Sequence, residues 1–375
     1  MINRFYDDLI DEYLVPNKVL LIYGPRQVGK TTLVTQYLER CHEQVYSSSG
    51  ENAQLQAVLN SNDFSRIIPY FSHYDLVVID EAQKIENIGQ GLKIIVDQIP
   101  GIKVIATGSS NFALSNKLGE PLVGRQKVKH LFPVSVQELT DNYGGAYVWE
   151  NLDNLLVFGA YPEVITAVSL IEKKEYLAQL RDAYLYKDIL ELEQIRASKK
   201  ILDLLRLLAY QIGSEVSLQE LGNSLGMSKN TVARYLDLLE KAFVLINVGG
   251  FSRNLRKEVT KTSRYYFYDL GVRNAIINNF SYPNERTDTG QLWENFLFIE
   301  RVKKLEYQQI FANFYFWRTW DRQEIDLVEE RDGKLFGYEF KYGQKTPKAP
   351  KAWQKAYPDA TFAGINRDNF LDFVS

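Results

Sequence analysis

The residues best suited to chemistry form a glycine-rich stretch near the amino terminus. The stretch reads Gly24-Pro25-Arg26-Gln27-Val28-Gly29-Lys30-Thr31-Thr32. In a G-x-x-x-x-G-K-T loop the glycines let the backbone close around an anion, and successive N–H groups and a helix N-terminus meet the phosphates. Lys30 can then reach the β- and γ-phosphate oxygens, and the Thr31 hydroxyl can ligate Mg²⁺. The spacing therefore predicts a phosphate-binding loop over residues 24–32.

The elements on either side of this loop must hold it at a junction between a strand and a helix. Residues 18–23 form a short apolar run suited to a buried strand, and residues 32–38 carry apolar side chains at helical spacing. A strand, a glycine-rich loop and a helix in this order are what a phosphate loop needs. An ordinary glycine-rich turn is the alternative, and these flanks argue against it.

A second apolar run delivers two carboxylates. Residues 76–79 are followed by Asp80 and Glu81, about 50 residues after the loop. We expect Asp80 to hold Mg²⁺ through its water shell and Glu81 to orient and activate the attacking water. The alternative is a strand that ends at a solvated acidic turn, and the preceding phosphate loop makes it the weaker interpretation.

A third apolar run, residues 102–107, is followed by small polar side chains. Ser109 is our candidate for sensing the γ-phosphate, and Ser110 and Asn111 compete for the same role. Strands that alternate with helical segments imply a parallel, doubly wound sheet whose ligand lies at the carboxyl ends of the strands. Because all three motifs fall at such ends, the sequence predicts that they form one site.

Taken together, these motifs resemble the prokaryotic AAA-family ATPases that carry a C-terminal domain of unknown function. Besides the loop, the resemblance rests on Ile-Asp-Glu-Ala-Gln at 79–83, Thr-Gly-Ser-Ser at 107–110, Leu-Val-Gly-Arg at 122–125 and Phe-Pro-Val-Ser at 132–135. It covers essentially the whole chain and implies ATP and ADP as ligands. It also makes Arg125 a catalytic candidate that contacts phosphate, in cis or from a neighbouring subunit of a homo-oligomer. A surface salt bridge is the alternative role for Arg125.

The composition limits the remaining classes of function. In a chain of 375 residues, 45% hydrophobic and 24% charged residues predict folded domains throughout, and a net charge of −3 argues against a uniformly basic nucleic-acid coat. A single cysteine and three scattered histidines leave no disulfide within the chain and no Cys/His metal cluster. Neither a membrane-spanning run nor a signal peptide is visible, so we expect a soluble cytoplasmic protein without a membrane partner.

Residues 198–275 predict a winged helix-turn-helix. Residues 217–220 read as a capping box that opens a helix ending near Gly226, and a second helix starts at Ser228. The apolar face of that second helix leaves polar side chains exposed in its N-terminal half. The candidate DNA contacts are Lys229, Asn230, Thr231 and Arg234.

The charge of this region supports the DNA hypothesis. Between residues 228 and 264 there are eight Lys or Arg against three Asp or Glu, a local charge of +5. The predicted wing, residues 244–268, carries five of these cations: Arg253, Arg256, Lys257, Lys261 and Arg264. DNA is therefore a candidate partner. A winged helix that docks a protein partner, with its basic residues solvated, is the alternative.

Residues 288–375 carry a second constellation of charged residues. A helix containing Glu294 precedes three strands of a meander, and Asp326, Glu339 and Lys341 lie on the last two strands. This layout resembles the restriction-endonuclease-like superfamily, whose D…E-x-K core binds Mg²⁺. By that resemblance Asp326 and Glu339 would ligate the metal with help from Glu294, and the catalytic Lys341 would stabilise charge or lower the pKa of the attacking water. Ile325 stands where the superfamily often has proline.

We therefore expect an α/β protein with four parts. These are a P-loop ATPase domain with a parallel sheet (1–145), a helical lid or connector (146–197), a winged helix (198–275) and a restriction-endonuclease-like α/β domain (288–375). ATP and Mg²⁺ are the expected cofactors, and the ATP state would control DNA engagement or cleavage. The alternative is a nucleotide-dependent switch whose inactive nuclease-like domain and winged helix dock protein partners.

Overall fold

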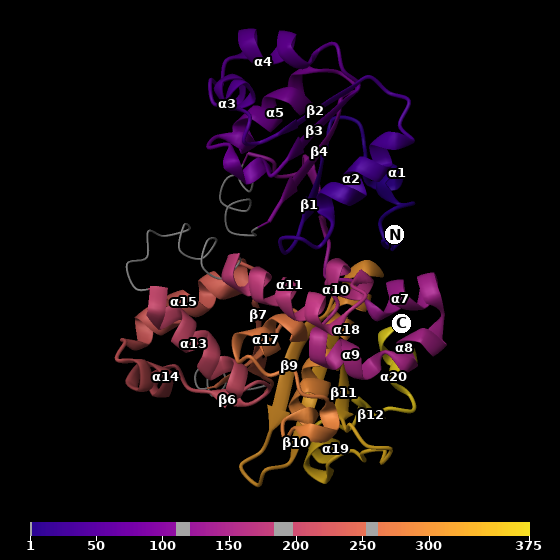
Figure 1. Ribbon diagram of the computed structural model, residues 1–375, viewed down its shortest axis with the longest axis vertical. Helices are drawn as coiled ribbons and strands as arrows, with labels where there is room; N and C mark the ends of the chain where they lie inside the picture. Colours follow the sequence, from indigo (N-terminus) through magenta and orange to yellow (C-terminus); the bar gives the residue numbers. More distant parts are fainter. Residues whose placement is uncertain (1, 110–120, 184–197, 253–261) are drawn as a thin grey trace. The chain divides into compact units, whose positions relative to one another are not determined.

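The computed structural model describes residues 2–109, 121–183, 198–252 and 262–375. The chain forms two compact units (Figure 1). The first contains residues 1–132 with 241–243, and the second contains residues 133–240 with 244–375. The boundary after Phe132 falls inside the predicted first domain, 1–145.

The first unit is built on a parallel sheet with the strand order β2-β3-β4-β1-β5. Its strands are β1 (Val19–Tyr23), β2 (Val45–Ser49), β3 (Leu76–Asp80), β4 (Lys103–Gly108) and β5 (Gln126–His130). The connecting helices are α1 (Ile10–Tyr13), α2 (Lys30–Glu39), α3 (Ala53–Leu59), α4 (Phe64–Phe71), η1 (Ala82–Lys84) and α5 (Ile88–Gln98). The parallel α/β architecture predicted for this region is confirmed.

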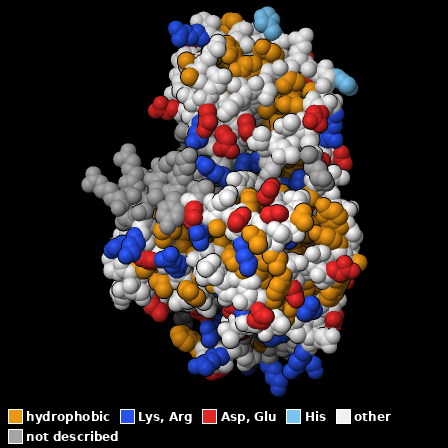
Figure 2. All heavy atoms as spheres, in the orientation of Figure 1, with side chains coloured by type: hydrophobic (Ala, Val, Ile, Leu, Met, Phe, Trp, Pro, Cys, Tyr) orange, Lys and Arg blue, Asp and Glu red, His pale blue; other side chains and the backbone are white. Residues whose placement is uncertain are grey.

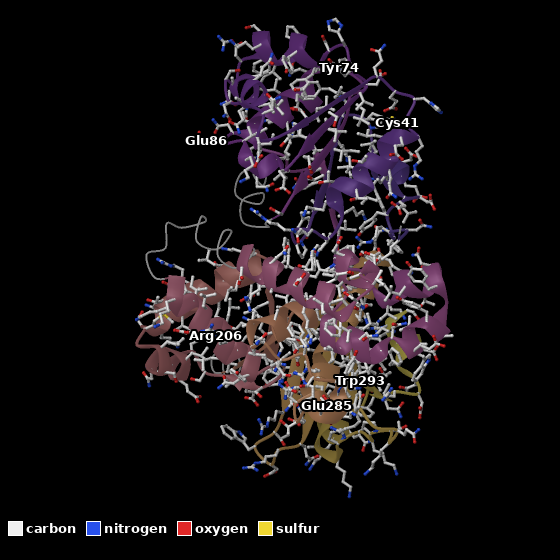
Figure 3. All side chains as sticks on the ribbon, viewed as in Figure 1. Cys41, Tyr74, Glu86, Arg206, Glu285 and Trp293 are labelled. Carbon is white, nitrogen blue, oxygen red and sulfur yellow. The ribbon has the colours of Figure 1, made fainter. Side chains whose placement is uncertain are left out.

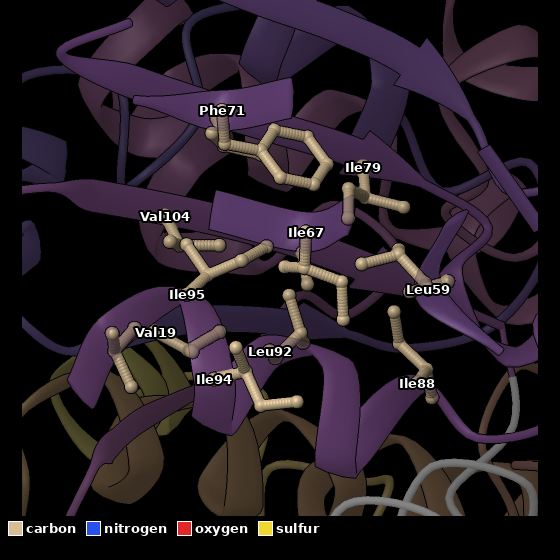
Figure 4. Packing of buried hydrophobic residues seen from close by; sticks show 14 of the residues in the cluster. Val19, Leu59, Ile67, Phe71, Ile79, Ile88, Leu92, Ile94, Ile95 and Val104 are labelled. Atoms are coloured by element: carbon tan, nitrogen blue, oxygen red, sulfur yellow. The ribbon is translucent and has the colours of Figure 1, made fainter. Parts of the chain in front are cut away.

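Buried aliphatic side chains of α3, α4 and α5 pack against the sheet (Figure 4). Leu59, Ile67 and Leu92 are fully buried there against Val104 of β4. Burying one such side chain contributes about 2 kcal/mol. Because this core lies against the central strands, it fixes the positions at which those strands end.

The second unit contains a mixed seven-stranded sheet of order β12-β11-β10-β9-β7-β8-β6. The strands are β6 (Glu215–Val216), β7 (Leu245–Gly250), β8 (Ser263–Phe267), β9 (Asn313–Arg318), β10 (Glu324–Arg331), β11 (Lys334–Phe340) and β12 (Thr361–Ile365). The pairs β7–β9 and β11–β12 are parallel, and the other pairs are antiparallel. The predicted meander of β9, β10 and β11 is thus present.

The helices of this unit fall into two groups, one before β6 in sequence and one after it. The first group is α7 (Val136–Tyr143), α8 (Gly145–Glu150), α9 (Leu152–Phe158), α10 (Pro162–Thr166), α11 (Leu170–Ala183) and α13 (Ser198–Tyr210). The second is α14 (Leu218–Leu225), α15 (Lys229–Lys241), α17 (Leu270–Ile276), η3 (Pro283–Glu285), α18 (Thr289–Tyr307), α19 (Lys351–Ala356) and α20 (Phe370–Val374). The helical character predicted for residues 146–197 is confirmed as far as Ala183.

One sheet contains strands from both the predicted winged helix (198–275) and the predicted C-terminal domain (288–375). The β7–β8 hairpin follows α15, and its Gly249 and Gly250 pair with Tyr315 and Phe316 of β9. The hairpin therefore has a neighbouring strand on each side, β9 and β6, and its strands do not form an isolated wing.

Helix α14 ends just before the glycine that the sequence indicates, but the capping box predicted at its start does not form. The helix begins at Leu218 and ends at Leu225, followed by Gly226 with a φ of 59°, as a C-terminal glycine favours. The predicted capping box is wrong, because the Ser217 side chain makes no capping hydrogen bond. A capping box does open α7, where Ser135 and Glu138 exchange hydrogen bonds.

Helix α18 lies in the interior of the second unit. Trp293 is fully buried (Figure 3). Charged side chains of the same helix are also buried and paired: Arg301 Nε lies 2.7 Å from Glu329 Oε1, and Lys303 Nζ lies 2.6 Å from Glu300 Oε1. None of the helices within the described ranges is both long and apolar enough to cross a membrane.

Candidate functional site

The predicted phosphate loop connects β1 to α2, and the Lys30 side chain hydrogen-bonds back to the start of the loop. Gly29 precedes α2 with a φ of 96°, a conformation that glycine adopts without strain. Gly24 has no room for a side chain, because a Cβ there would lie 2.0 Å from the Leu131 carbonyl oxygen. The Lys30 ammonium is buried and donates to the carbonyls of Gly24 (2.9 Å) and Pro25 (2.7 Å).

Arg4 supports the loop from outside the motif. Its guanidinium is buried and donates to the carbonyls of Val28 and Phe132, the latter at 2.6 Å. It thereby ties the back of the loop to the segment that follows β5. The sequence does not predict a role for Arg4, since nothing in its local spacing indicates a contact with the loop.

A hydroxyl and a carboxylate from different elements meet beside the loop. Thr31 Oγ1 at the start of α2 donates to Asp80 Oδ2 at the end of β3, at 2.9 Å. The buried Thr107 hydroxyl of β4 donates to the other oxygen of Asp80 and accepts from the Glu81 backbone N–H at 3.0 Å. The strand ends thus bring together the predicted residues Thr31 and Asp80.

Glu81 is held by a small polar network. Its backbone is left-handed, with a φ of 51°. Its Oε2 accepts from Ser109 Oγ at 3.1 Å and from Gln83 Nε2, which also donates to Ser109 Oγ at 2.9 Å. Because β4 lies between β1 and β3, Ser109 follows the strand between the loop and Glu81. Ser110 and Asn111, the competing candidates, lie outside the described residues.

Arg125 lies at the opposite edge of the sheet. Its carbonyl accepts from the Val19 N–H at 2.8 Å, where β1 begins, whereas the phosphate loop follows the end of β1. One strand length, about 16 Å, separates the two edges. The expected cis contact of Arg125 with phosphate is therefore wrong. The arginine pairs with Asp97 Oδ1 at 2.6 Å.

The residues at the loop fit a nucleotide with Mg²⁺. Lys30 would supply the cation for phosphate, and the loop residues after Pro25, among them the exposed Gln27 and Thr32, would supply backbone N–H groups. The pair Thr31 and Asp80 supplies two oxygen donors 2.9 Å apart, the ligand type that Mg²⁺ prefers.

A second group of carboxylates surrounds Arg264 of β8. The guanidinium lies 2.9 Å from Glu294, 3.3 Å from Glu324 and 3.6 Å from Asp326. Tyr266 Oη also donates to Glu294 Oε1, at 2.6 Å. Arg264 and its three carboxylate partners line a pocket of about 380 Å³ together with Arg318 and Lys341. We call Arg264, Glu294, Glu324, Asp326, Glu339 and Lys341 the Arg264 cluster.

Burial and mutual repulsion raise the pKa values of the carboxyl groups of Glu294, Asp326 and Glu339 in the Arg264 cluster. Burial and the Asp326 charge raise the pKa of Glu294 to about 8 and that of Glu339 to about 7. Burial raises the pKa of Asp326, whose Oδ2 accepts from the Phe340 N–H at 2.9 Å. Lys341 Nζ donates to Glu339 Oε1 at 2.9 Å.

These positions do not fit the predicted metal site. Asp326, Glu339 and Lys341 are neighbours on β10 and β11, as the meander predicts, and Glu294 approaches from α18. Nevertheless Arg264 lies between Glu294 and Asp326, and the described residues contain no group of three His, Cys, Asp or Glu side chains arranged to hold a metal. The sequence pattern treats Arg264 as a wing cation, whereas this residue is 4% exposed.

The predicted DNA contacts lie together at the start of α15. Lys229, Asn230 and Arg234 are exposed, and Thr231 is half-buried with its hydroxyl 2.9 Å from Ser228 Oγ. Arg253, Arg256, Lys257 and Lys261 lie outside the described residues. On the face seen in Figure 2, acidic and basic side chains are interspersed over both units.

Comparison with family models assigns classes to parts of the chain. Residues 16–140 match an AAA domain, residues 149–282 match a domain of unknown function (DUF8612), and residues 289–367 match another (DUF4143). The chain therefore contains an AAA-type P-loop ATPase domain followed by a C-terminal DUF4143 domain. The match to an AAA domain supports nucleotide-dependent ATPase activity, and domains of this class bind nucleotide, usually with Mg²⁺.

Similar proteins extend over nearly the whole chain. An uncharacterized protein of Mycobacterium tuberculosis is 26% identical over 358 residues, which cover 92% of this chain and 75% of that protein. An uncharacterized protein of Methanocaldococcus jannaschii is 24% identical over 379 residues, covering 95% and 82% respectively. Among solved structures, the Walker-type ATPase of Pyrococcus abyssi is 16% identical with a TM-score of 0.48, covering 73% of this chain and 94% of that one.

Proposed function

We propose that the chain binds ATP with Mg²⁺ at residues 24–32 and hydrolyses the γ-phosphate bond. In this proposal the loop N–H groups and Lys30 hold the phosphates, and Thr31 and Asp80 hold the metal, directly and through its water shell. Bound Mg²⁺ would neutralise the charge that develops on the phosphate oxygens. Ser109 would contact the γ-phosphate.

One observation carries this proposal: the Thr31 hydroxyl and the Asp80 carboxylate, from α2 and β3, meet at 2.9 Å beside the loop. Residues 49 positions apart converge there with the geometry that the motif spacing requires. The neighbouring Thr107 hydroxyl fixes the second Asp80 oxygen, so the carboxylate is oriented before a ligand arrives.

Glu81 is proposed to orient the attacking water and to take its proton. Hydrogen bonds from Ser109 and Gln83 reach Oε2, which leaves Oε1 as the oxygen for water. A residue that senses the γ-phosphate would thus also hold the general base. Loss of the γ-phosphate would alter the position of Ser109 and, through it, that of Glu81.

For the second unit we propose a DNA contact made by Lys229, Asn230, Thr231 and Arg234 on α15. Support comes from the exposure of three of these side chains at the N-terminal half of a helix that follows a short turn. Protein docking is the second candidate. The observation that favours it is a groove of about 620 Å³ beside Lys229 that the acidic residues Asp237 and Glu240 also line.

The test of the ATPase proposal is nucleotide binding and hydrolysis by Lys30→Ala. We expect loss of measurable ATP binding, because the cation facing the phosphates is removed. Lys18→Ala is the control, since Lys18 lies just before β1 at the opposite edge of the sheet. ATP affinity that is unchanged in Lys30→Ala would overturn the proposal.

A further inference from the structure

We propose that Arg264 is the permanent cation of the Arg264 cluster and that this cluster is an ion-pair junction that takes no divalent metal. The proposal concerns the second unit alone and stands apart from ATP hydrolysis at the loop. It also means that the DUF4143 region does not act as a metal-dependent nuclease through Asp326, Glu339 and Lys341.

The guanidinium lies between Glu294 and Asp326, two of the three carboxylates that were expected to hold the metal. A Mg²⁺ ion requires oxygen ligands at about 2.0–2.1 Å in a near-octahedral arrangement. Arg264 Nη1 is 2.9 Å from Glu294 Oε1 and 3.6 Å from Asp326 Oδ1, so one nitrogen spans the two carboxylates. An ion placed between these oxygens would overlap the nitrogen.

The surroundings of Arg264 keep it in place. The side chain is 96% buried, and its guanidinium stacks over the Phe316 ring with 4.7 Å between the guanidinium carbon and the ring centroid. Nη2 reaches Glu324 at 3.3 Å, whereas Nη1 reaches Glu294. Withdrawing the arginine to admit a metal would break these contacts and leave a buried guanidinium without its carboxylate partners.

Arg264 also does not lose its positive charge by releasing a proton. An arginine side chain stays protonated under all physiological conditions. Burial lowers the pKa of Arg264, but the Glu294, Tyr266 and Asp326 groups outweigh this effect and raise the pKa above the usual range. The cation is therefore present at every pH at which the protein is folded.

The junction connects three segments that are distant in sequence. Arg264 lies on β8, Glu294 lies on α18, and Glu324 and Asp326 lie on β10. Arg318 on β9 adds a further link by pairing with Glu215 of β6 at 2.6 Å. The cluster thus ties the hairpin that follows α15 to the meander, which is a structural role that fits charged residues at these positions.

The first test uses chains that keep Arg264. Mn²⁺ binding is measured by electron paramagnetic resonance without nucleotide, on the wild type, Asp326→Asn and, as an exposed control, Asp359→Asn. Asparagine can still accept the Phe340 N–H, so this variant should fold. We expect the same Mn²⁺ stoichiometry in all three. One Mn²⁺ per chain that disappears only in Asp326→Asn would overturn the proposal.

The second test removes the resident cation. Arg264→Ala should gain one Mn²⁺ per chain, and the double variant Arg264→Ala/Asp326→Asn should lose it again. Because Arg264→Ala leaves like charges together, we also expect Mn²⁺ to raise its thermal midpoint while leaving that of the wild type unchanged. A folded Arg264→Ala that gains no Mn²⁺ would contradict the proposal. If this variant does not fold, the comparison with Asp326→Asn decides.

A cleavage assay provides an independent readout. Plasmid DNA incubated with the wild type and Mn²⁺ should stay intact at the level of a buffer control, with and without ATP. Cleavage that requires Mn²⁺ and is lost in Lys341→Ala would overturn the proposal, because it would show an active metal centre in the presence of Arg264.

Discussion

Two sites in this molecule contain the same residue types, Asp, Glu and Lys, on neighbouring elements. At the phosphate loop, Asp80 accepts hydrogen bonds from the Thr31 and Thr107 hydroxyls. In the Arg264 cluster, Asp326 instead faces a buried guanidinium at 3.6 Å. Hydroxyl partners orient a carboxylate and leave its charge available for a metal, whereas a guanidinium neutralises that charge within the protein.

The partner of a carboxylate decides its chemistry more than the surrounding sequence motif does. Both motifs have suitable spacing in the sequence, and in both the strands bring the predicted residues together. The difference arises from one residue, Arg264, which reaches its site from a strand outside the predicted meander. The following predictions test this comparison.

The largest effect is expected for Glu81→Gln. If Glu81 activates water, this change should lower the rate of ATP hydrolysis by about 10²–10⁴-fold while ATP affinity stays within about threefold. The glutamine amide oxygen can still accept from Ser109, so the fold of the site is kept. Glu86→Gln, at an exposed neighbouring position, is the control. A hydrolysis rate unchanged in Glu81→Gln would remove Glu81 from the mechanism.

Arg4→Ala should weaken ATP binding by about tenfold without changing the loop sequence. The change removes the donor for the carbonyls of Val28 and Phe132, and a buried acceptor left without a partner costs about 1–3 kcal/mol. ATP titration by calorimetry measures the effect. The control Arg40→Ala removes an exposed arginine that pairs with Asp8. Equal affinities in the two variants would show that Arg4 does not position the loop.

His130, at the end of β5, makes the stability of the first unit depend on pH. Burial and the nearby Lys30 charge lower the pKa of His130 to about 3, so the folded state favours the neutral ring. Its stabilising contribution is complete above the unfolded pKa near 6.5 and is lost as pH falls toward 3. Between pH 7.5 and pH 5 the loss is of the order of 2 kcal/mol.

The measurement for His130 is urea unfolding at pH 7.5 and pH 5. In His130→Gln the decrease in unfolding free energy between these two pH values should be smaller than in the wild type by that amount. His73→Gln, at an exposed position, should behave as the wild type. If the unfolding free energy of His130→Gln depends on pH as strongly as that of the wild type, other titratable groups cause the dependence.

The smallest effect is expected at α15. If the second unit binds DNA through surface cations, Arg234→Ala should weaken binding to all sequences alike and lower the slope of log affinity against log salt by about 1. Arg206→Ala, an exposed arginine on α13, is the control. Fluorescence anisotropy with duplex DNA makes the measurement. The same slope in both variants would favour protein docking at the groove beside Lys229.

Patterns formed by residues that are neighbours in the chain account for most of the features that the sequence predicts. The loop, Asp80, Glu81 and Ser109 each follow a short apolar run, and a parallel sheet brings the ends of such runs to one edge. The helices up to Ala183 and the C-terminal meander also follow from local periodicity. These features depend on neighbours in the chain, so a single sequence contains them.

Contacts between distant segments were not predictable in this way. Arg4 reaches carbonyls 24 and 128 residues away, and Arg264 reaches carboxylates 30 and 60 residues away. The family resemblance made Arg125 a candidate to contact phosphate in cis or from a neighbouring subunit, whereas strand direction carries it to the other edge of the sheet. Such outcomes depend on which strands pair, and local periodicity does not determine that pairing.

The most direct test of the comparison is a Mn²⁺ titration of the wild-type chain, with and without a nonhydrolysable ATP analogue, followed by electron paramagnetic resonance. We predict one tightly bound Mn²⁺ per chain when the analogue is present and none when it is absent, because only the phosphate loop takes a metal. Tight Mn²⁺ binding without nucleotide that Asp326→Asn abolishes would contradict the account.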